Sequence, residues 1–366
     1  MKSARSVRIF TGISIATLAI SAISALAFGT VSASITKIDA FAGIDKRPDK
    51  KSSAINYLLV GSDTREGLTK EELKQLRVGS VATAAGKRSD TMLLVHISKA
   101  RDKAVIVSIP RDTFALIPAH LNKDGKTIPA VHSKINSAFN WGGAPLLIQT
   151  IEEMTQLKID HYVEVNFAGF ARVIDSLGGI EVCTKKDIDD PKSHLVLPAG
   201  VHTLNGIEAL KYVRTREFDG MGDLGRMQRQ QAFMSSVLKK ASSAGVLLNP
   251  ITMTSFINSS LAAVTTDDGL KNSDLITLAK QMKSLATSNV RTLTVPLSDL
   301  NYYSNGVTAS VLWDPVLAPE LWDRLREDRA VVDEVTASPS PSSTKAAKVE
   351  IVDKFKTRTA DDNICR

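Results

Sequence analysis

The stretch that follows Arg8 constrains this chain more than any other feature, because residues 9–36 contain no charged side chain. They are long enough to cross the apolar core of a bilayer, which needs about 20 apolar residues. Lys2 and Arg5 lie with Arg8 before the stretch, and positive charge favours the cytoplasmic side for that end of a membrane segment. We therefore predict a cytoplasmic segment at 1–8, a transmembrane signal-anchor at 9–36 and an extracellular remainder.

Cleavage of this segment is the alternative. Val31-Ser32-Ala33 resembles a signal-peptidase site, and a secretory signal is removed from the mature protein. The apolar run is longer than the usual core of a signal peptide, so we favour an uncleaved, single-pass anchor in the cell membrane. The next segment, 37–53, is polar and rich in lysine, and we expect a linker there.

Beyond the linker, short apolar runs alternate with amphipathic stretches. INYLLVGSD (55–63) and KAVIVSIP (103–110) indicate buried strands, because they are short, apolar and rich in β-branched or aliphatic residues. Helical spacing of apolar residues recurs at 68–77, 145–157 and 224–241. This alternation predicts an α/β fold with three α/β/α layers, in which helices flank a central mixed sheet.

Changes in composition suggest the domain boundaries. A chain of 366 residues has room for one large domain with an anchor and a tail. We expect this domain at 54–300, a C-terminal extension of it at 301–335 and a tail at 347–366. Residues 336–346 are rich in proline and serine, which predicts a flexible linker.

The composition also argues against some functions. Aromatic residues make up 5% of the chain, too few for wide stacking surfaces on single-stranded nucleic acid. The formal net charge is +7, and three of these charges precede the apolar stretch, so the remainder of the chain is only mildly basic. An extracellular domain would also lie on the wrong side of the membrane for DNA. We therefore expect no nucleic-acid partner.

The two cysteines, Cys183 and Cys365, allow two interpretations. Neither lies in a CxxC motif, which excludes a zinc ribbon or a thioredoxin-like site. Outside the cytoplasm they can form one disulfide, and otherwise both remain free thiols. We favour the disulfide, because Cys365 lies in a tail with little else to hold it.

Two aspartates lie at neighbouring ends of expected strands. Asp63 ends one strand in GSDTR, and Asp90 begins the next in RSDTM. Carboxylates at such strand ends can meet above the sheet, where α/β folds bind ligands. Two hard oxygen ligands suit Mg²⁺ when a phosphate substrate supplies part of the coordination. The alternative is a pair of aspartates that cap turns, the commoner meaning of Ser-Asp-Thr.

Basic side chains also collect at the ends of expected elements. The Arg-Thr-Arg spacing would place Arg214 and Arg216 on one face of an extended backbone, and Arg226, Arg229 and Gln230 lie within about one turn at the start of a helix. Guanidinium groups match phosphate oxygens, which predicts a pyrophosphate site. A solvated basic face with ion pairs is the alternative. The other arginines of the set are Arg65, Arg88 and Arg111, and the acidic partners for that alternative are Glu217, Asp219 and Asp223.

An ordered set of motifs within residues 55–241 resembles the LytR-CpsA-Psr family. The motifs are GSDTR, RSDTMLLVHI, VSIPRDT, KINSAF, FAGFARVIDSLGGIEV, LPAGVHTLNGIEALKYVRTRE and LGRMQRQQ. The resemblance implies a membrane-anchored phosphotransferase with an α/β/α core. Such an enzyme moves a glycopolymer, such as teichoic acid, capsule or arabinogalactan, from a polyprenyl-pyrophosphate carrier to peptidoglycan.

The resemblance also implies roles for single residues. Asp63 and Asp90 fall on the family's metal-binding aspartates, with Mg²⁺ as the expected ion and Mn²⁺ as a possible substitute. We assign Asp90, Arg111, Arg214 and Arg216 to catalysis, with Asp90 as the acceptor of the hydroxyl proton. The positions expected to contact pyrophosphate are Arg88, Arg111, Lys134, Arg214, Arg216, Arg226 and Gln230.

A long prenyl chain also requires an apolar slot. Its burial stabilises the complex by about 25 cal/mol for each Å² of apolar surface removed from water. Candidate lining residues lie on amphipathic helices and beside them, and for each of these residues the alternative is a place in the hydrophobic core. They are Phe139, Leu146, Phe167, Phe170, Val173, Ile174 and Leu177.

Two other functions fit the same residues. A non-catalytic binder or regulator of polyprenyl phosphates would keep the arginines and the slot without needing a metal. A lipid pyrophosphatase would use water in place of the sugar hydroxyl.

Overall fold

The computed structural model describes residues 35–76, 89–122, 124–216, 222–241, 243, 245, 249–271, 274, 287–336 and 349–359. The expected membrane segment lies outside these ranges except for its last two residues. Within the ranges, no helix is both long and apolar enough to span a membrane. The Pro/Ser-rich segment also lies outside them, apart from Thr336.

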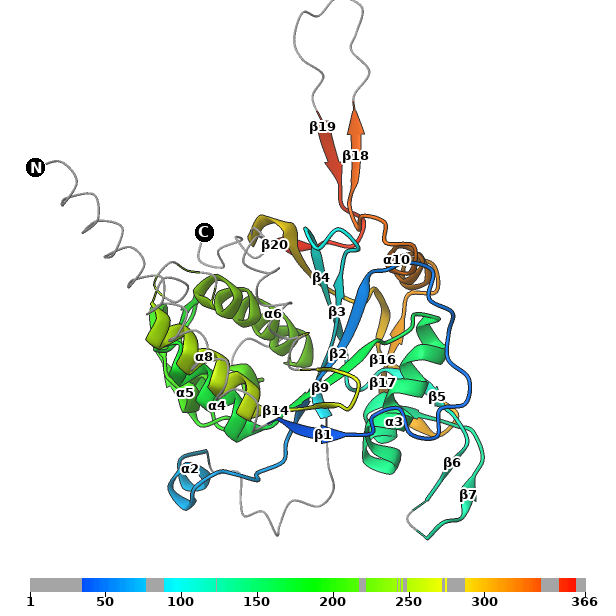
Figure 1. Cartoon of the computed structure of the whole chain (residues 1–366), viewed down its shortest axis with the longest axis horizontal. Helices are drawn as coiled ribbons and strands as arrows, with labels where there is room; N and C mark the ends of the chain where they lie inside the picture. The colour runs from blue at the N-terminus through cyan, green and yellow to red at the C-terminus, as the bar shows by residue number, and fades with distance from the viewer. Residues whose placement is uncertain are drawn as a thin grey trace, which may run out of the picture.

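A mixed sheet forms the centre of the described structure (Figure 1). Within the described ranges it has eight strands in the order β1-β14-β9-β2-β3-β4-β15-β20. Strands β2, β9, β4 and β15 run in the same direction, so their carboxyl ends share one edge of the sheet. The bounds are β1 Thr36–Ile38, β14 Val264–Asp267, β9 His161–Val165, β2 Ile55–Ser62, β3 Ser89–Ile97, β4 Ala104–Ile109, β15 Val290–Thr294 and β20 Arg358–Thr359.

Helices cover both faces of this sheet, which confirms the predicted mixed sheet flanked by helices. Figure 1 shows α4, α5, α6 and α8 on one side of the sheet and α3 on the other, near α10. A short helix, α2, follows β2 along the chain. The bounds are α2 Lys70–Leu76, α3 Ile135–Thr155, α4 Phe167–Ser176, α5 Gly206–Arg214, α6 Gly222–Ala241, α8 Pro250–Ala263 and α10 Leu317–Arg326.

Small antiparallel pairs surround the sheet. They comprise β5 Phe114–Ile117 with β8 Val131–Lys134, β6 His120–Leu121 with β7 Thr127–Ile128, β10 Ile180–Thr184 with β13 Gly200–Leu204, β11 Ile188–Asp190 with β12 Leu195–Leu197, β16 Leu297–Ser304 with β17 Val307–Trp313, and β18 Asp333–Thr336 with β19 Val349–Val352. Cys183 lies in β10 and is disulfide-bonded. Cys365, the partner expected from the sequence, lies outside the described residues.

A local signal explains where α2 begins, whereas α3 begins earlier than its sequence pattern predicted. Thr69 and Glu72 form reciprocal backbone hydrogen bonds of 3.1 and 2.6 Å, so a capping box precedes α2. Helix α3 begins at Ile135, ten residues before the predicted start at Pro145. The backbone leaves helical geometry at Gly143, where φ is 65° and ψ is −151°, so the predicted segment is only the second half of α3.

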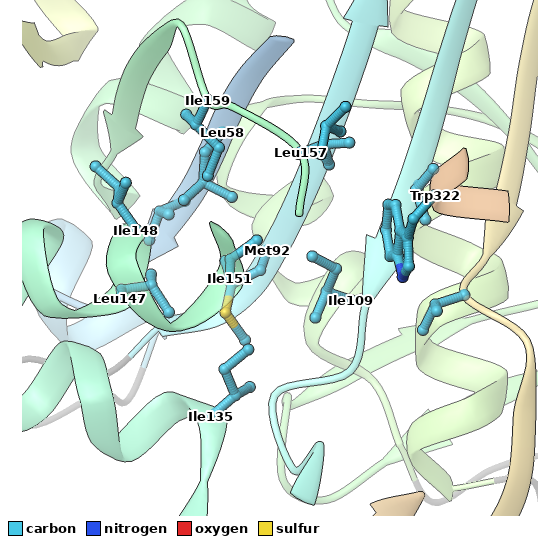
Figure 2. Close-up of a cluster of buried hydrophobic side chains, with 14 of the residues drawn as sticks. Leu58, Met92, Ile109, Ile135, Leu147, Ile148, Ile151, Leu157, Ile159 and Trp322 are labelled. Carbon is cyan, nitrogen blue, oxygen red and sulfur yellow. The ribbon is translucent and has the colours of Figure 1, made fainter. Parts of the chain in front are cut away.

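The main hydrophobic core fills the space between the sheet and the α3 face (Figure 2). Leu58 of β2 and Met92 of β3 meet Leu147 and Ile151 of α3 there, and all four are at most 1% exposed. Trp322 of α10 belongs to the same core. Because each strand buries alternate residues on this face, the other residues are left to pack under α6.

Two glycines let the helices of the opposite face approach closely. A Cβ atom on Gly169 of α4 would lie 2.4 Å from the carbonyl oxygen of Ala263 in α8. A Cβ atom on Gly206 of α5 would lie 2.3 Å from the carbonyl oxygen of Ala171 in α4. Helix α4 is therefore held between its two neighbours at a spacing that only glycine permits.

Residues 37–53, expected to form a linker, pack against the domain instead. The strand β1, which begins at Thr36, pairs in parallel with β14, and Ala40 is fully buried in the core. Arg47 donates to both carboxylate oxygens of Glu152 in α3, at 3.0 and 2.6 Å. The polar composition misled the prediction, because these polar groups form specific contacts with the domain.

The C-terminal segments are also integral to the fold. Residues 301–335, expected as an extension, supply most of the β16–β17 hairpin and the core helix α10. Residues 358–359, within the expected tail, form β20 at the edge of the central sheet. Such a short strand has no recognisable hydrophobic period, so the sequence did not predict it.

The buried pair of Arg47 and Glu152 provides a stability test. In Arg47→Ala, Glu152 keeps its bond from the Ile159 N–H but loses its charged partner while only 1% exposed. We expect a loss of about 3 kcal/mol in the free energy of unfolding, measured by urea denaturation. The matched control is Lys50→Ala, which breaks an ion pair with side chains 34% and 15% exposed and should cost less than about 1 kcal/mol. Equal losses would show that residues 37–53 are not anchored by Arg47.

Candidate functional site

The backbones of the two sequence-predicted aspartates lie at the carboxyl edge of β2. The β2–β3 register pairs Gly61 with Thr91 and then Ser62 with Ser89, so it skips Asp90 in a bulge. Asp63 directly follows Ser62 and is half-buried. The bulge therefore places Asp90 beside the strand end from which Asp63 emerges. Bulges of this kind often redirect a side chain near an active site.

An elongated cavity of about 370 Å³ begins at this edge and extends beneath the helices. Its floor is the sheet face opposite the main core, and its walls come from α4, α5 and α6. Most of its lining is apolar. The apolar residues of the lining are Leu59, Val60, Leu93, Val165, Phe167, Phe170, Leu210, Val213, Phe233 and Met234, of which Val60 belongs to the main core on the other face of the sheet.

Cationic side chains also line this cavity. Arg214 is the last residue of α5, and its guanidinium carbon lies 5.2 Å from the centre of the Phe167 ring. Arg216 follows after one residue, and Arg226 comes from the second turn of α6. Lys192, from the β11–β12 turn, completes this set. The cavity thus combines an apolar body with several positive charges, an arrangement that suits an amphiphilic anion.

A second cavity, of about 170 Å³, adjoins the first. The two share Thr91, Leu93, Arg226 and Gln230. The second cavity reaches Arg111, which follows β4, and is bounded by Leu300 of β16. Arg111 therefore lines the same cavity as Arg226.

Arg111, Asp112 and Lys134 form a row of charged side chains. Its Nε lies 3.4 Å from Oδ2 of Asp112, and the Nζ of Lys134 lies 3.3 Å from the other oxygen of the same carboxylate. Lys134 precedes α3 and lines neither cavity. Asp112 thus separates the two basic side chains, and only Arg111 reaches the cavity.

The structure brings together most of the residues expected to contact pyrophosphate. Arg111, Arg214, Arg216, Arg226 and Gln230 line the two adjoining cavities. Gln230 also donates a bond of 3.1 Å to the Val213 carbonyl. Arg88, and the side chains of Asp90, Glu217, Asp219 and Asp223, lie outside the described part of the structure, so the ion-pair alternative stays open.

Only two of the expected lipid-lining residues, Phe167 and Phe170, line the cavity. Phe139 and Leu146 belong to the main core instead, because α3 packs on the opposite face of the sheet. Ile174 and Leu177 point into a separate core that includes β10 and Phe233. Val173 is likewise not among the lining residues. Phe139, Leu146, Ile174 and Leu177 thus lie in hydrophobic cores, whereas Val173 is half-buried and belongs to neither core.

The sequence reasoning missed several lining residues. Phe233 and Met234 follow Gln230 by about one helical turn, so the periodicity of α6 contained a signal for them. Leu210 and Val213 similarly precede Arg214 on α5. Lys192 had no recognisable signal, because only the folded β11–β12 turn brings it to the cavity.

One buried phenol, that of Tyr212, packs beside the cavity residue Phe233. Burial raises the pKa of Tyr212, against the opposing effect of the nearby Arg229 guanidinium, so the phenol stays neutral.

Among the described residues, no group of three or more His, Cys, Asp or Glu side chains could hold a metal ion. A metal at this edge would need oxygen ligands from a substrate or from water.

The fold is that of a mixed α/β protein with an apolar cavity, lined in part by cationic side chains, that opens near the carboxyl edge of its central sheet. A sequence model of the LytR_cpsA_psr family matches residues 26–319. This protein belongs to the LytR-CpsA-Psr family.

Named relatives agree with this assignment. The chain is 35% identical over 275 residues to the probable cell wall biosynthesis protein LcpB of Corynebacterium glutamicum, covering 75% of this chain and 62% of the relative. It is 35% identical over 204 residues to a Bacillus subtilis protein named polyisoprenyl-teichoic acid–peptidoglycan teichoic acid transferase TagT, covering 54% of this chain and 56% of the relative. The matches span less than two thirds of the length of either relative.

A solved structure shares the fold. TagT bound to LIIa-WTA aligns with a TM-score of 0.57 and 27% sequence identity, covering 79% of this chain and 98% of that one. This similarity supports the mixed α/β architecture with its flanking helices.

A larger side chain in the apolar part of the cavity should weaken binding of a prenyl chain without weakening binding of pyrophosphate at the cationic part. In Met234→Trp, the larger side chain would occupy the apolar body, so we expect binding of geranylgeranyl pyrophosphate to weaken at least about tenfold. Inorganic pyrophosphate should bind as it does to the wild type, because the arginines are unchanged. Isothermal titration calorimetry would measure both affinities.

The control is Leu238→Trp, one turn further along α6. Leu238 packs against the sheet but does not line the cavity. If both variants lost the prenyl ligand equally, general damage to α6 would explain the result and the assignment of the slot would fail.

Proposed function

We propose that this protein is a phosphotransferase that moves a cell-wall glycopolymer, as a sugar phosphate, from a polyprenyl-pyrophosphate carrier to peptidoglycan. The observation that carries this proposal is the apolar cavity lined by Arg214, Arg216 and Arg226. The slot matches a hydrocarbon tail, and the arginines match a pyrophosphate head. The name of the relative TagT, a teichoic acid transferase, supports the class of reaction.

The reaction exchanges the phosphoanhydride bond of the pyrophosphate for a new phosphate ester bond. A hydroxyl oxygen of the peptidoglycan sugar attacks the phosphorus that carries the polymer, and the bond to the carrier phosphate breaks. The products are a phosphodiester-linked polymer and a polyprenyl phosphate. Since the pyrophosphate bond is already activated, no nucleotide is required.

The arginines stabilise the charge that develops on the phosphates. Arg214 and Arg216 would bind the pyrophosphate from the α5 side, while Arg111 approaches from the end of β4. Arg226 lines both cavities and therefore lies between these two groups. Positive groups already in place before the reaction lower the barrier more than groups that must reorganise.

Asp63 and Asp90 fit a magnesium site that the substrate completes. The support is that the backbones of both residues lie at the β2–β3 bulge, next to Ser62 of the cavity lining, and that carboxylate oxygens are ligands that Mg²⁺ prefers. Bound there, Mg²⁺ would neutralise pyrophosphate oxygens, and Mn²⁺ could replace it. We assign to Asp90 the second role of accepting the proton of the attacking hydroxyl.

We further propose that residues 9–36 remain as a single-pass anchor, with residues 1–8 in the cytoplasm and the domain outside the cell membrane. The support is the long uncharged stretch with positive charges before it. Such an anchor would keep the cavity beside the bilayer that contains the carrier.

The role of Arg111 can be tested by transfer of a lipid-linked polymer to peptidoglycan. We expect Arg111→Ala to reduce turnover about 100- to 1000-fold, because a charge that stabilises the leaving phosphate is lost. Arg329→Ala, which removes an exposed ion pair with Glu327, should leave turnover unchanged. Wild-type turnover in Arg111→Ala would rule out this mechanism.

The same assay separates the two alternative functions. EDTA treatment and Asp63→Ala should both abolish transfer, with activity restored by Mg²⁺ in the wild type only. A wild-type protein that binds the carrier but transfers to no acceptor would be a binder or regulator. Release of phosphate without polymer transfer would identify a lipid pyrophosphatase.

A further inference from the structure

The peptide bond between Thr215 and Arg216 is held on both sides by buried charged side chains. Its carbonyl oxygen accepts a bond of 2.6 Å from Nη2 of Arg229 in α6. Its N–H donates to Oδ2 of Asp190, at the end of β11. Asp190 is 1% exposed and Arg229 is 8% exposed, while Thr215 is fully buried. Two elements distant in sequence thus fix the plane of one peptide.

The second oxygen of Asp190 organises a neighbouring turn. Oδ1 accepts 2.8 Å bonds from the backbone N–H groups of Lys192 and Ser193. Lys192 and Arg216 both line the large cavity. A single buried carboxylate therefore connects the backbones of two cationic residues of the site.

The Thr215–Arg216 peptide needs these hydrogen bonds because it lies directly after the end of α5. Helix α5 ends at Arg214, and the residue after it, Thr215, is already extended with φ −59° and ψ 144°. The last carbonyls of a helix have no partners within the helix. Here Gln230 binds the Val213 carbonyl and Arg229 binds that of Thr215. Without these bonds, the chain that carries Arg216 could rotate as it leaves the helix.

We infer that Asp190 and Arg229 are positioning residues that clamp the Thr215–Arg216 peptide and so hold the Arg216 guanidinium at the anion site. This inference rests on the proposed function, since it assigns the cavity to a pyrophosphate head. Neither residue was expected from the sequence to have this role. Neither side chain lines the cavity, so both act through Arg216.

Asparagine at position 190 would break the clamp without removing the turn. Its amide oxygen can still accept from Lys192 and Ser193, as Oδ1 does now. Its NH₂ group would then face the N–H of Arg216, and two donors cannot form a hydrogen bond. Asp190→Asn therefore releases one side of the peptide while the buried volume stays almost constant.

The test measures binding of geranylgeranyl pyrophosphate to the full chain in detergent, in the presence of Mg²⁺. We expect Asp190→Asn to weaken binding about 10- to 100-fold, because a displaced guanidinium loses its contact geometry. Amide hydrogen exchange at Arg216 should become faster in the same variant. Unchanged affinity and unchanged exchange would overturn the inference.

A double variant with Arg216→Ala tests whether Asp190 positions Arg216 or has only a general structural role. If Asp190 acts through Arg216, then Asp190→Asn should add less than about twofold to the loss caused by Arg216→Ala. Fully additive losses would contradict the inference. The matched control is Asp267→Asn. Asp267 is also 1% exposed and accepts a hydrogen bond from the Tyr162 N–H, but it lies at the end of β14, at the edge of the sheet opposite the carboxyl ends of β2 and β9. That variant should bind the probe as the wild type does.

The two proposals can fail separately. A wild type that binds the probe but transfers no polymer would remove the proposed reaction and leave the clamp standing. A wild type that transfers polymer while Asp190→Asn keeps full affinity would remove the clamp and leave the reaction. Failure of the wild type to bind the probe would overturn both.

Discussion

The contact between α6 and the sheet determines how the rest of the site is arranged. Gln231 of α6 is 6% exposed and donates to Ser108 of β4 and Thr294 of β15, at 3.1 and 2.8 Å. Because a buried amide must keep its partners, these bonds allow α6 one rotation about its axis. That rotation turns Arg226 toward the cavity and Arg229 toward the end of α5. Gln231 thus adds a specific polar contact to the packing of α6, the helix that contributes Arg226 and Gln230 to the cavity.

Much of the sheet could be predicted from the sequence, because a buried strand of six to eight apolar residues has a clear pattern. The strand ends then place Asp63, Asp90 and Arg111 at a common edge. The strands β1 and β20 could not be predicted, since two or three residues carry no period and their pairing is entirely non-local. Arg47 could not be assigned to Glu152 for the same reason.

The arrangement of the site was predicted less completely. Arg214 and Arg216 do line one cavity, but the extended backbone considered for the Arg-Thr-Arg spacing is present only at Thr215, since α5 continues to Arg214. Helical periodicity identifies an apolar face without saying which side of the sheet receives it. That ambiguity explains why Phe139 of α3 was assigned to the slot although it belongs to the main core.

The glycine contacts of α4 have a consequence for ligand entry. Gly169 lets α4 pack against backbone atoms of α8, and Gly206 of α5 packs against backbone atoms of α4. The cavity wall that carries Phe167 and Phe170 is therefore fixed and cannot move inward. An apolar cavity with rigid walls stays open when empty. If the cavity binds a hydrocarbon chain, as proposed, the free energy of holding its walls apart is contributed during folding, and the ligand meets a preformed site. A bulkier residue at either glycine would harm ligand capture before it harmed the chemistry.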